Sequence, residues 1–80
     1  SGASQLNGED TDHIFAPMPG KIIKVNVSVG DSVLKGANLL IVEAMKMENQ
    51  IKAPRDAVIA KINVKVNDMV AAKSPLINFE

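Results

Sequence analysis

Several residue types that proteins use for covalent chemistry are missing or nearly missing from this sequence. The chain of 80 residues has no cysteine, tryptophan or tyrosine, only two phenylalanines, and a single histidine, His13. Without cysteine there are no disulfides, thiolate zinc sites or thiol nucleophiles, and one histidine cannot form a histidine-rich metal site or a catalytic triad. A chain this short also cannot enclose a large substrate cleft. We therefore expect no metal site and no catalytic residues, and the composition argues against a large self-contained enzyme.

The charge balance and the hydropathy narrow the class further. Nine basic and nine acidic side chains give a formal net charge of zero. With so few aromatic rings to stack on bases, this balance argues against nucleic-acid binding. No apolar run approaches the roughly 20 residues of a membrane span, and the first residues lack the apolar core of a signal peptide. These features predict a cytoplasmic protein that does not insert directly into a membrane.

The composition changes after residue 13. Residues 1–13 contain one large aliphatic residue, Leu6, among mostly small and polar residues, which is typical of a disordered leader or linker. This segment holds three of the nine acidic residues and none of the basic ones, so residues 14–80 carry nine basic and six acidic groups. We predict a single, mildly basic domain over residues 14–80, behind an acidic tether.

An internal repeat organises that domain. Residues 14–43 align with residues 51–80 at a constant offset of 37, without a gap and with twelve identical pairs in thirty positions. Such a repeat indicates two copies of one structural unit, neither of which can bury its apolar face alone.

Each copy carries the pattern of β-structure. Apolar and polar residues alternate over 23–29 and again over 60–66, which predicts half-buried strands. Gly30-Asp31 and Asn67-Asp68 then predict turns, and further strands are expected at 39–42 and 75–79. We expect an all-β fold, in which two quasi-twofold-related halves of about four short strands interlock as a flattened β-barrel or sandwich.

Seven residues, 44–50, are the only part of the domain without a counterpart in the repeat. They separate two predicted strands, so we expect a hairpin with Lys46 near its tip. A two-residue hairpin turn favours asparagine or glycine, and Met45 and Lys46 are neither, which points to a functional site. The residues alone leave two interpretations. Lys46 is an ordinary solvated lysine with Met45 and Met47 packed on the barrel, or the exposed methionines and the amine form a recognition surface for another protein.

A family resemblance favours the second interpretation. The sequence around Lys46 is similar to the attachment motif of biotinyl domains, the biotin carboxyl carrier modules of biotin-dependent carboxylases and decarboxylases, and the segments at 16–20, 29–33 and 53–54 also match. The resemblance covers 14–80 and implies a barrel-sandwich hybrid fold. It also implies that a biotin protein ligase acylates Lys46, which makes covalently bound biotin the cofactor.

The same resemblance implies roles for the residues around the lysine. Met45 and Met47 would contact the ligase and later partners, and Ala44 would be small enough for the turn to close. Three other residues around the lysine match the family pattern: Glu43, Glu48 and Asn49. Each of them is either a contact of the ligase or an ordinary solvated polar side chain.

The resemblance implies a carrier component that is not itself an enzyme and that transports a carboxyl group between a biotin carboxylase or decarboxylase site and a carboxyltransferase site. The gapless repeat leaves no room for the protruding thumb of some bacterial acetyl-CoA carboxylase carriers, which favours an acyl-CoA, pyruvate or decarboxylase-type system. If the chain is a piece of a eukaryotic carboxylase, the mitochondrial matrix replaces the cytoplasm. Two alternatives are a lipoyl carrier domain, which typically places aspartate before and alanine after its lysine, and an unmodified structural module of the same fold.

Overall fold

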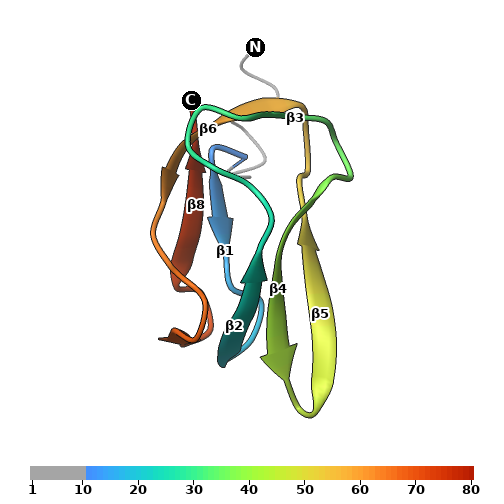
Figure 1. The fold of residues 1–80 in the computed structure, drawn as a ribbon, viewed down its shortest axis with the longest axis vertical. Helices are drawn as coiled ribbons and strands as arrows, with labels where there is room; N and C mark the ends of the chain where they lie inside the picture. Colours follow the sequence, from blue (N-terminus) through green and yellow to red (C-terminus); the bar gives the residue numbers. More distant parts are fainter. Residues whose placement is uncertain (1–10) are drawn as a thin grey trace, which may run out of the picture.

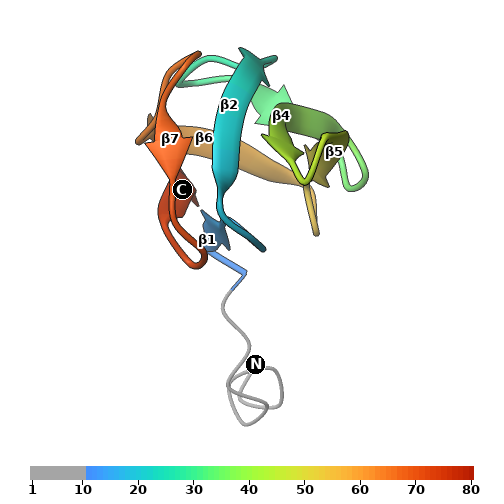
Figure 2. The same cartoon turned by 90° about the horizontal axis from the view of Figure 1, so that it is seen from below.

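The computed structural model describes residues 11–80, which form two antiparallel four-stranded sheets (Figure 1). The strands are β1 (His13–Phe15), β2 (Gly20–Val25), β3 (Ser32–Val33), β4 (Asn38–Ala44), β5 (Met47–Lys52), β6 (Ala57–Ile62), β7 (Met69–Val70) and β8 (Pro75–Phe79). One sheet has the order β1-β8-β6-β3 and the other β5-β4-β2-β7. Seen from below in Figure 2, the strands surround a common centre. The all-β prediction is confirmed, and no helix in the described part of the chain could span a membrane.

The sequence repeat is a quasi-twofold symmetry of the fold. Strands β2, β3 and β4 begin 37 residues before β6, β7 and β8, and β1 corresponds to the end of β5. Exchanging the two halves converts the strand order of one sheet into that of the other. Each sheet takes two strands from each half, so the halves interlock as predicted and bury their apolar faces against each other.

Hydrogen bonds between the halves follow the same symmetry. The Gly30 N–H donates to the Ile59 carbonyl at 2.8 Å, and the Asn67 N–H donates to the Ile22 carbonyl at 2.7 Å. Gly30 and Asn67 have φ values of 94° and 81°, in the left-handed region that glycine and asparagine tolerate. The turns predicted at these positions are confirmed.

The core lies between the two sheets and is built from aliphatic side chains. The largest fully buried side chains are Ile22, Leu39, Leu40, Val42, Ile59, Leu76 and Ile77. Six of these seven form pairs related by the offset of 37 residues, so the two halves contribute nearly equal shares. Burial of one such side chain contributes roughly 1.5–3 kcal/mol. The stability of the fold therefore comes from the repeat, and the unpaired segment 44–50 lies outside this set.

The strands predicted at 23–29 and 60–66 are shorter in the structure. β2 ends at Val25 and β6 at Ile62. The alternating burial continues as far as Val27, which is half-buried, whereas Val29 is 63% exposed. The prediction was wrong at these ends because the chain turns away from the sheet after each strand, and alternating valines cannot report that turn.

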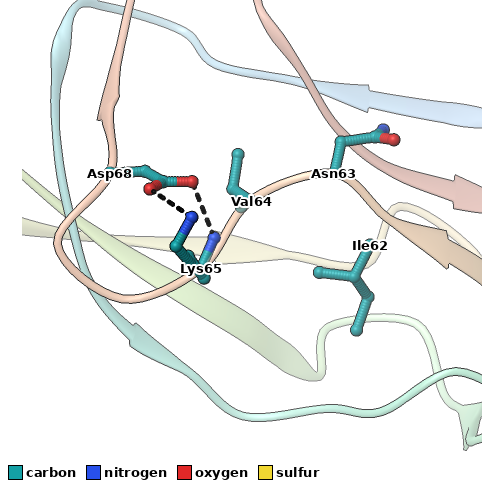
Figure 3. A pocket seen from close by; sticks show the side chains of 5 residues that line it. All are labelled: Ile62, Asn63, Val64, Lys65 and Asp68. Carbon is teal, nitrogen blue, oxygen red and sulfur yellow. Dashed lines mark hydrogen bonds and ion pairs between the residues drawn. The ribbon is translucent and has the colours of Figure 1, made fainter.

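An aspartate closes each of those turns. The Ser28 N–H donates to Asp31 Oδ2 at 2.9 Å, and the Lys65 N–H donates to Asp68 Oδ2 at 3.0 Å. Figure 3 shows the second turn, where Lys65 Nζ also lies 3.5 Å from Asp68 Oδ1. The pocket drawn there is lined by residues 62–65 and Asp68. Because these residues form the turn and its own bonds, we interpret the pocket as a product of the turn.

The folded domain begins before the boundary expected at residue 14. Residues 1–10 of the predicted leader lie outside the described residues, but His13 belongs to β1. The Phe79 N–H donates to the Asp12 carbonyl at 2.8 Å. The Asp12 carboxylate lies 2.8 Å from Nη2 of Arg55, whose guanidinium stands 5.1 Å from the centre of the Phe79 ring. Residues 12 and 13 are therefore part of the domain, and Asp12 is tied to its surface.

Candidate functional site

The hairpin between β4 and β5 carries the segment that the repeat leaves over. The two strands pair from Asn38 with Lys52 to Ala44 with Met47, and only Met45 and Lys46 connect them. Figure 1 shows this hairpin projecting from the lower end of the molecule. The hairpin with Lys46 at its tip, predicted from the sequence, is confirmed.

Both residues of the turn adopt left-handed backbone conformations. Met45 has φ of 53° and Lys46 has φ of 65°, which is the pattern of a type I′ turn. This turn matches the twist of the flanking strands, but a residue with a Cβ atom pays about 1–2 kcal/mol to adopt it. The turn is therefore strained at both positions. Asparagine and glycine would relieve this strain, but the sequence has methionine and lysine there. Strain of this kind is concentrated at functional sites.

The side chains at the tip face solvent. Met45 is 88% exposed and Met47 65% exposed, so the interpretation in which they pack on the barrel is wrong. Lys46 is exposed, and it makes no hydrogen bond or ion pair with any residue of 11–80. Its amine is therefore available to an enzyme that approaches the tip. The methionines beside it are flexible and polarisable, which suits contact with more than one protein surface.

The base of the turn is held against the barrel by two small residues. Ala44 is only 6% exposed, in agreement with the expected need for a small residue there. Gly20, at the start of β2, lies beside it: a Cβ atom on Gly20 would stand 2.5 Å from the Glu43 carbonyl oxygen and 2.7 Å from Val42 Cγ1. Only glycine allows this approach. Sequence reasoning noted Gly20 as part of the family pattern but gave no signal of this contact, which joins residues far apart in the chain.

The three polar residues of the motif have different surroundings. Asn49 is half-buried, and its Nδ2 donates to the carbonyls of Val42 and Met47, each at 3.3 Å. Its side chain therefore ties the two strands of the hairpin together. Glu43 and Glu48 are exposed and directly opposite each other. Like charges in this position are destabilising, although Lys21 of β2 lies opposite Glu43 on its other side.

Apart from the amine of Lys46, the tip of the hairpin, residues 44–47, carries only alanine and methionine side chains. Residues 11–80 hold no group of three or more His, Cys, Asp or Glu side chains able to bind a metal ion. No hydroxyl, imidazole or carboxylate is bonded to Lys46 within that range. An uncatalysed lysine in water is almost fully protonated at neutral pH and is a poor nucleophile. The arrangement presents the Lys46 amine to solvent at the tip of the hairpin.

Comparison with known families gives a match over nearly the whole chain. The family model described as "Biotin-requiring enzyme", Biotin_lipoyl, matches residues 12–79. This range begins at Asp12, whose carbonyl accepts a hydrogen bond from the Phe79 N–H, and ends at the last residue of β8. The matched range therefore contains all eight strands of the structure.

Individual proteins show the same likeness. The chain is 60% identical over 48 residues to the protein named methylmalonyl-CoA decarboxylase subunit gamma from Veillonella parvula. The aligned residues make up 60% of this chain and 37% of that protein. It is 48% identical over 62 residues to the biotin carboxyl carrier protein of Streptococcus mutans, covering 78% of the chain and 48% of the relative. The chain thus spans less than half the length of either relative.

A solved structure supports the fold. The structure of a single-chain, multi-domain long-chain acyl-CoA carboxylase matches with a TM-score of 0.81 and 29% identity. The match covers 85% of this chain and 7% of that one. The two-sheet architecture described above is therefore also found as one small part of a much larger carboxylase chain.

Proposed function

Because the chain belongs to the biotin and lipoyl attachment family and is a carrier domain of the kind found in biotin-dependent carboxylases and decarboxylases, we propose that Lys46 carries biotin as an amide on its Nζ. The observation that supports this most directly is the hairpin itself. Within residues 14–80, the only segment outside the repeat contains a strained two-residue turn, and that turn presents one lysine, unbonded within the described residues, between exposed methionines.

The domain has a passive part in its own modification. A biotin protein ligase would bring an activated biotin acyl group to the tip and accept the proton that leaves the Lys46 ammonium. Nζ then forms a bond to the acyl carbon as the bond from that carbon to its leaving group breaks. The hairpin contributes the position of the Lys46 backbone. Paired strands up to Ala44 and Met47, and the Asn49 bonds across them, hold the turn in place at the end of the barrel, from which the lysine side chain extends into solvent.

The chemistry that biotin supplies when bound is transfer of a carboxyl group, taken up at a biotin carboxylase or decarboxylase site and given up at a carboxyltransferase site. The domain contributes proximity, because a tethered group reaches both sites at a high local concentration. The partners that follow are a biotin carboxylase or decarboxylase and a carboxyltransferase, and we place the protein in the cytoplasm, or in the mitochondrial matrix if it comes from a eukaryotic carboxylase.

The structure also bears on the class of substrate. The connection between β2 and β3 spans residues 26–31, the same length as its counterpart at 63–68. The connection therefore has no extra length for a thumb between these two strands. Together with the relative named as a methylmalonyl-CoA decarboxylase subunit, this supports an acyl-CoA, pyruvate or decarboxylase-type system.

Intact mass spectrometry tests the attachment. After co-expression with a biotin protein ligase, we expect one biotinyl group on the wild-type chain and none on Lys46→Ala, which should stay folded because Lys46 packs against nothing in the core. Lys73→Ala is a matched control, since Lys73 is also exposed, in a turn, with φ of 67°, and it should be biotinylated like the wild type.

Three results would overturn the proposal. They are an unmodified wild-type chain, a biotin adduct that persists on Lys46→Ala, and a lipoyl adduct in place of biotin when both ligases are present. The last of these would favour the lipoyl alternative, and the first, if lipoyl is absent too, the unmodified structural module.

A further inference from the structure

Four exposed side chains form a row across the sheet that carries the hairpin. Glu43 in β4 is paired with Glu48 in β5 and with Lys21 in β2, and Lys21 is paired in turn with Met69 in β7. Directly paired residues of antiparallel strands point to the same face. This face is the outer one, because Val42, the neighbour of Glu43, is fully buried. We call Glu48, Glu43, Lys21 and Met69 the outer row.

Met69 is the unexpected member of the outer row. It is 74% exposed, and it comes from the second half of the repeat, where its counterpart in the first half is Ser32. In Figure 2, β7, β2, β4 and β5 follow one another around the end of the molecule from which the hairpin projects. A third exposed methionine therefore lies at the same end as Met45 and Met47.

The charges of the outer row are also unbalanced. Glu43 and Glu48 face each other, and within residues 11–80 neither takes part in an ion pair. A protein surface with a cation at this point would relieve the repulsion between the two carboxylates. The outer row is thus complementary to a partner that offers a basic group for the glutamates and a shallow apolar depression for the methionine.

We propose, building on the attachment of biotin to Lys46, that this partner is the biotin protein ligase, and that Met69 anchors the ligase on the domain. The short reach of an unmodified lysine supports this assignment. A bare lysine reaches only about 6 Å from Cα to Nζ, so the enzyme that acylates it must come close to the turn and touch the surface around it. Once acylated, the arm is roughly twice as long, and later enzymes can reach its end with less contact to the domain.

The size of a protein interface brings Met69 into reach of that enzyme. A stable interface covers about 800 Å² on each partner, which corresponds to a disc of roughly 16 Å radius. Met69 is two strands away from Glu43, about 10 Å across the sheet, and Lys46 is roughly 8 Å further along the strand direction. The two residues are therefore about 13 Å apart by strand geometry, so a ligase centred on Lys46 and seated on the outer face covers Met69.

Ligation kinetics with a purified biotin protein ligase test the proposal. We expect Met69→Glu to lower kcat/KM about tenfold and Met69→Ala about threefold, mainly through KM, because an anchor is lost while the reacting amine is unchanged. Leu34→Glu is the matched control. Leu34 is 71% exposed and follows β3, at the opposite end of the molecule in Figure 1, so this variant should react like the wild type.

A binding measurement separates docking from chemistry. In the unreactive Lys46→Arg background, Met69→Glu should raise the Kd for the ligase about tenfold, like the change in kcat/KM. The free energies of unfolding of Met69→Glu and Leu34→Glu in urea should be the same. Equal kcat/KM for Met69→Glu, Leu34→Glu and the wild type would overturn the assignment of Met69. That result leaves biotin on Lys46 intact, whereas a wild-type chain that the ligase does not modify would overturn the proposed function itself.

Discussion

Replacement of Met45 by asparagine is predicted to stabilise the domain. Met45 has φ of 53° and is 88% exposed, so it adds strain to the turn and almost no packing to the core. A left-handed residue with a Cβ atom costs about 1–2 kcal/mol, and asparagine, which favours this region, should recover roughly half of that cost. We expect Met45→Asn to raise the free energy of unfolding by about 0.5–1 kcal/mol and the Tm by roughly 2–6 °C.

The measurement is urea unfolding followed by far-UV circular dichroism, because the chain has no tryptophan or tyrosine to report by fluorescence. The slope m should stay unchanged if only the stability of the folded state changes. Two variants serve as controls. Lys73→Asn replaces another exposed residue with positive φ, 67°, and should gain a similar amount. Val29→Asn replaces a residue that is 63% exposed and has no positive φ, and should gain nothing.

The pattern among the three variants decides the question. If Lys73→Asn is stabilised and Met45→Asn is not, the turn formed by Met45 and Lys46 is not strained. Backbone strain would then no longer indicate a functional site at this turn. If Val29→Asn gains as much as Met45→Asn, the effect is one of surface polarity and not of backbone conformation. We further expect Met45→Asn to be biotinylated more slowly than the wild type, since stability gained at a functional site usually costs function.

Three further variants test the fold that supports the hairpin. Gly20→Ala should destabilise the domain by about 1–3 kcal/mol in urea unfolding, because its Cβ atom would overlap the Glu43 carbonyl and Val42; a change of only a few tenths would show that β2 moves aside freely. Val27→Ala and Val64→Ala should each cost roughly 1–2 kcal/mol, since both side chains are half-buried against the core at equivalent positions. A difference of more than about 1 kcal/mol between these two valine variants would contradict the twofold symmetry.

The repeat is the reason that so much of this fold could be read from the sequence. Two copies with the same pattern must solve the same burial problem, and the identical pairs such as Ile22 with Ile59 and Leu39 with Leu76 are fully buried in both halves. Residues 44–50 could be identified because they lie between the two copies and have no counterpart in either. The hairpin with Lys46 at its tip follows from the strands on either side. The ends of β2 and β6 could not be read in this way, because the valines continue to alternate after the backbone has turned.

The sequence by itself determined the β-class, the twofold plan and the hairpin with Lys46 at its tip, since each of these depends on residues close together in the chain or on a regular period. Only the tertiary structure decided the rest of the site. It showed that Met45 and Met47 project into solvent, that Gly20 lets β2 approach Glu43, and that Met69 lies in the same row as the glutamates. The approach of β2 to Glu43 and the row that contains Met69 both join residues more than 20 positions apart. Both are set by strand order and register. A period or a local motif carries no information about either, so the surface around Lys46 is defined only once the sheets have formed.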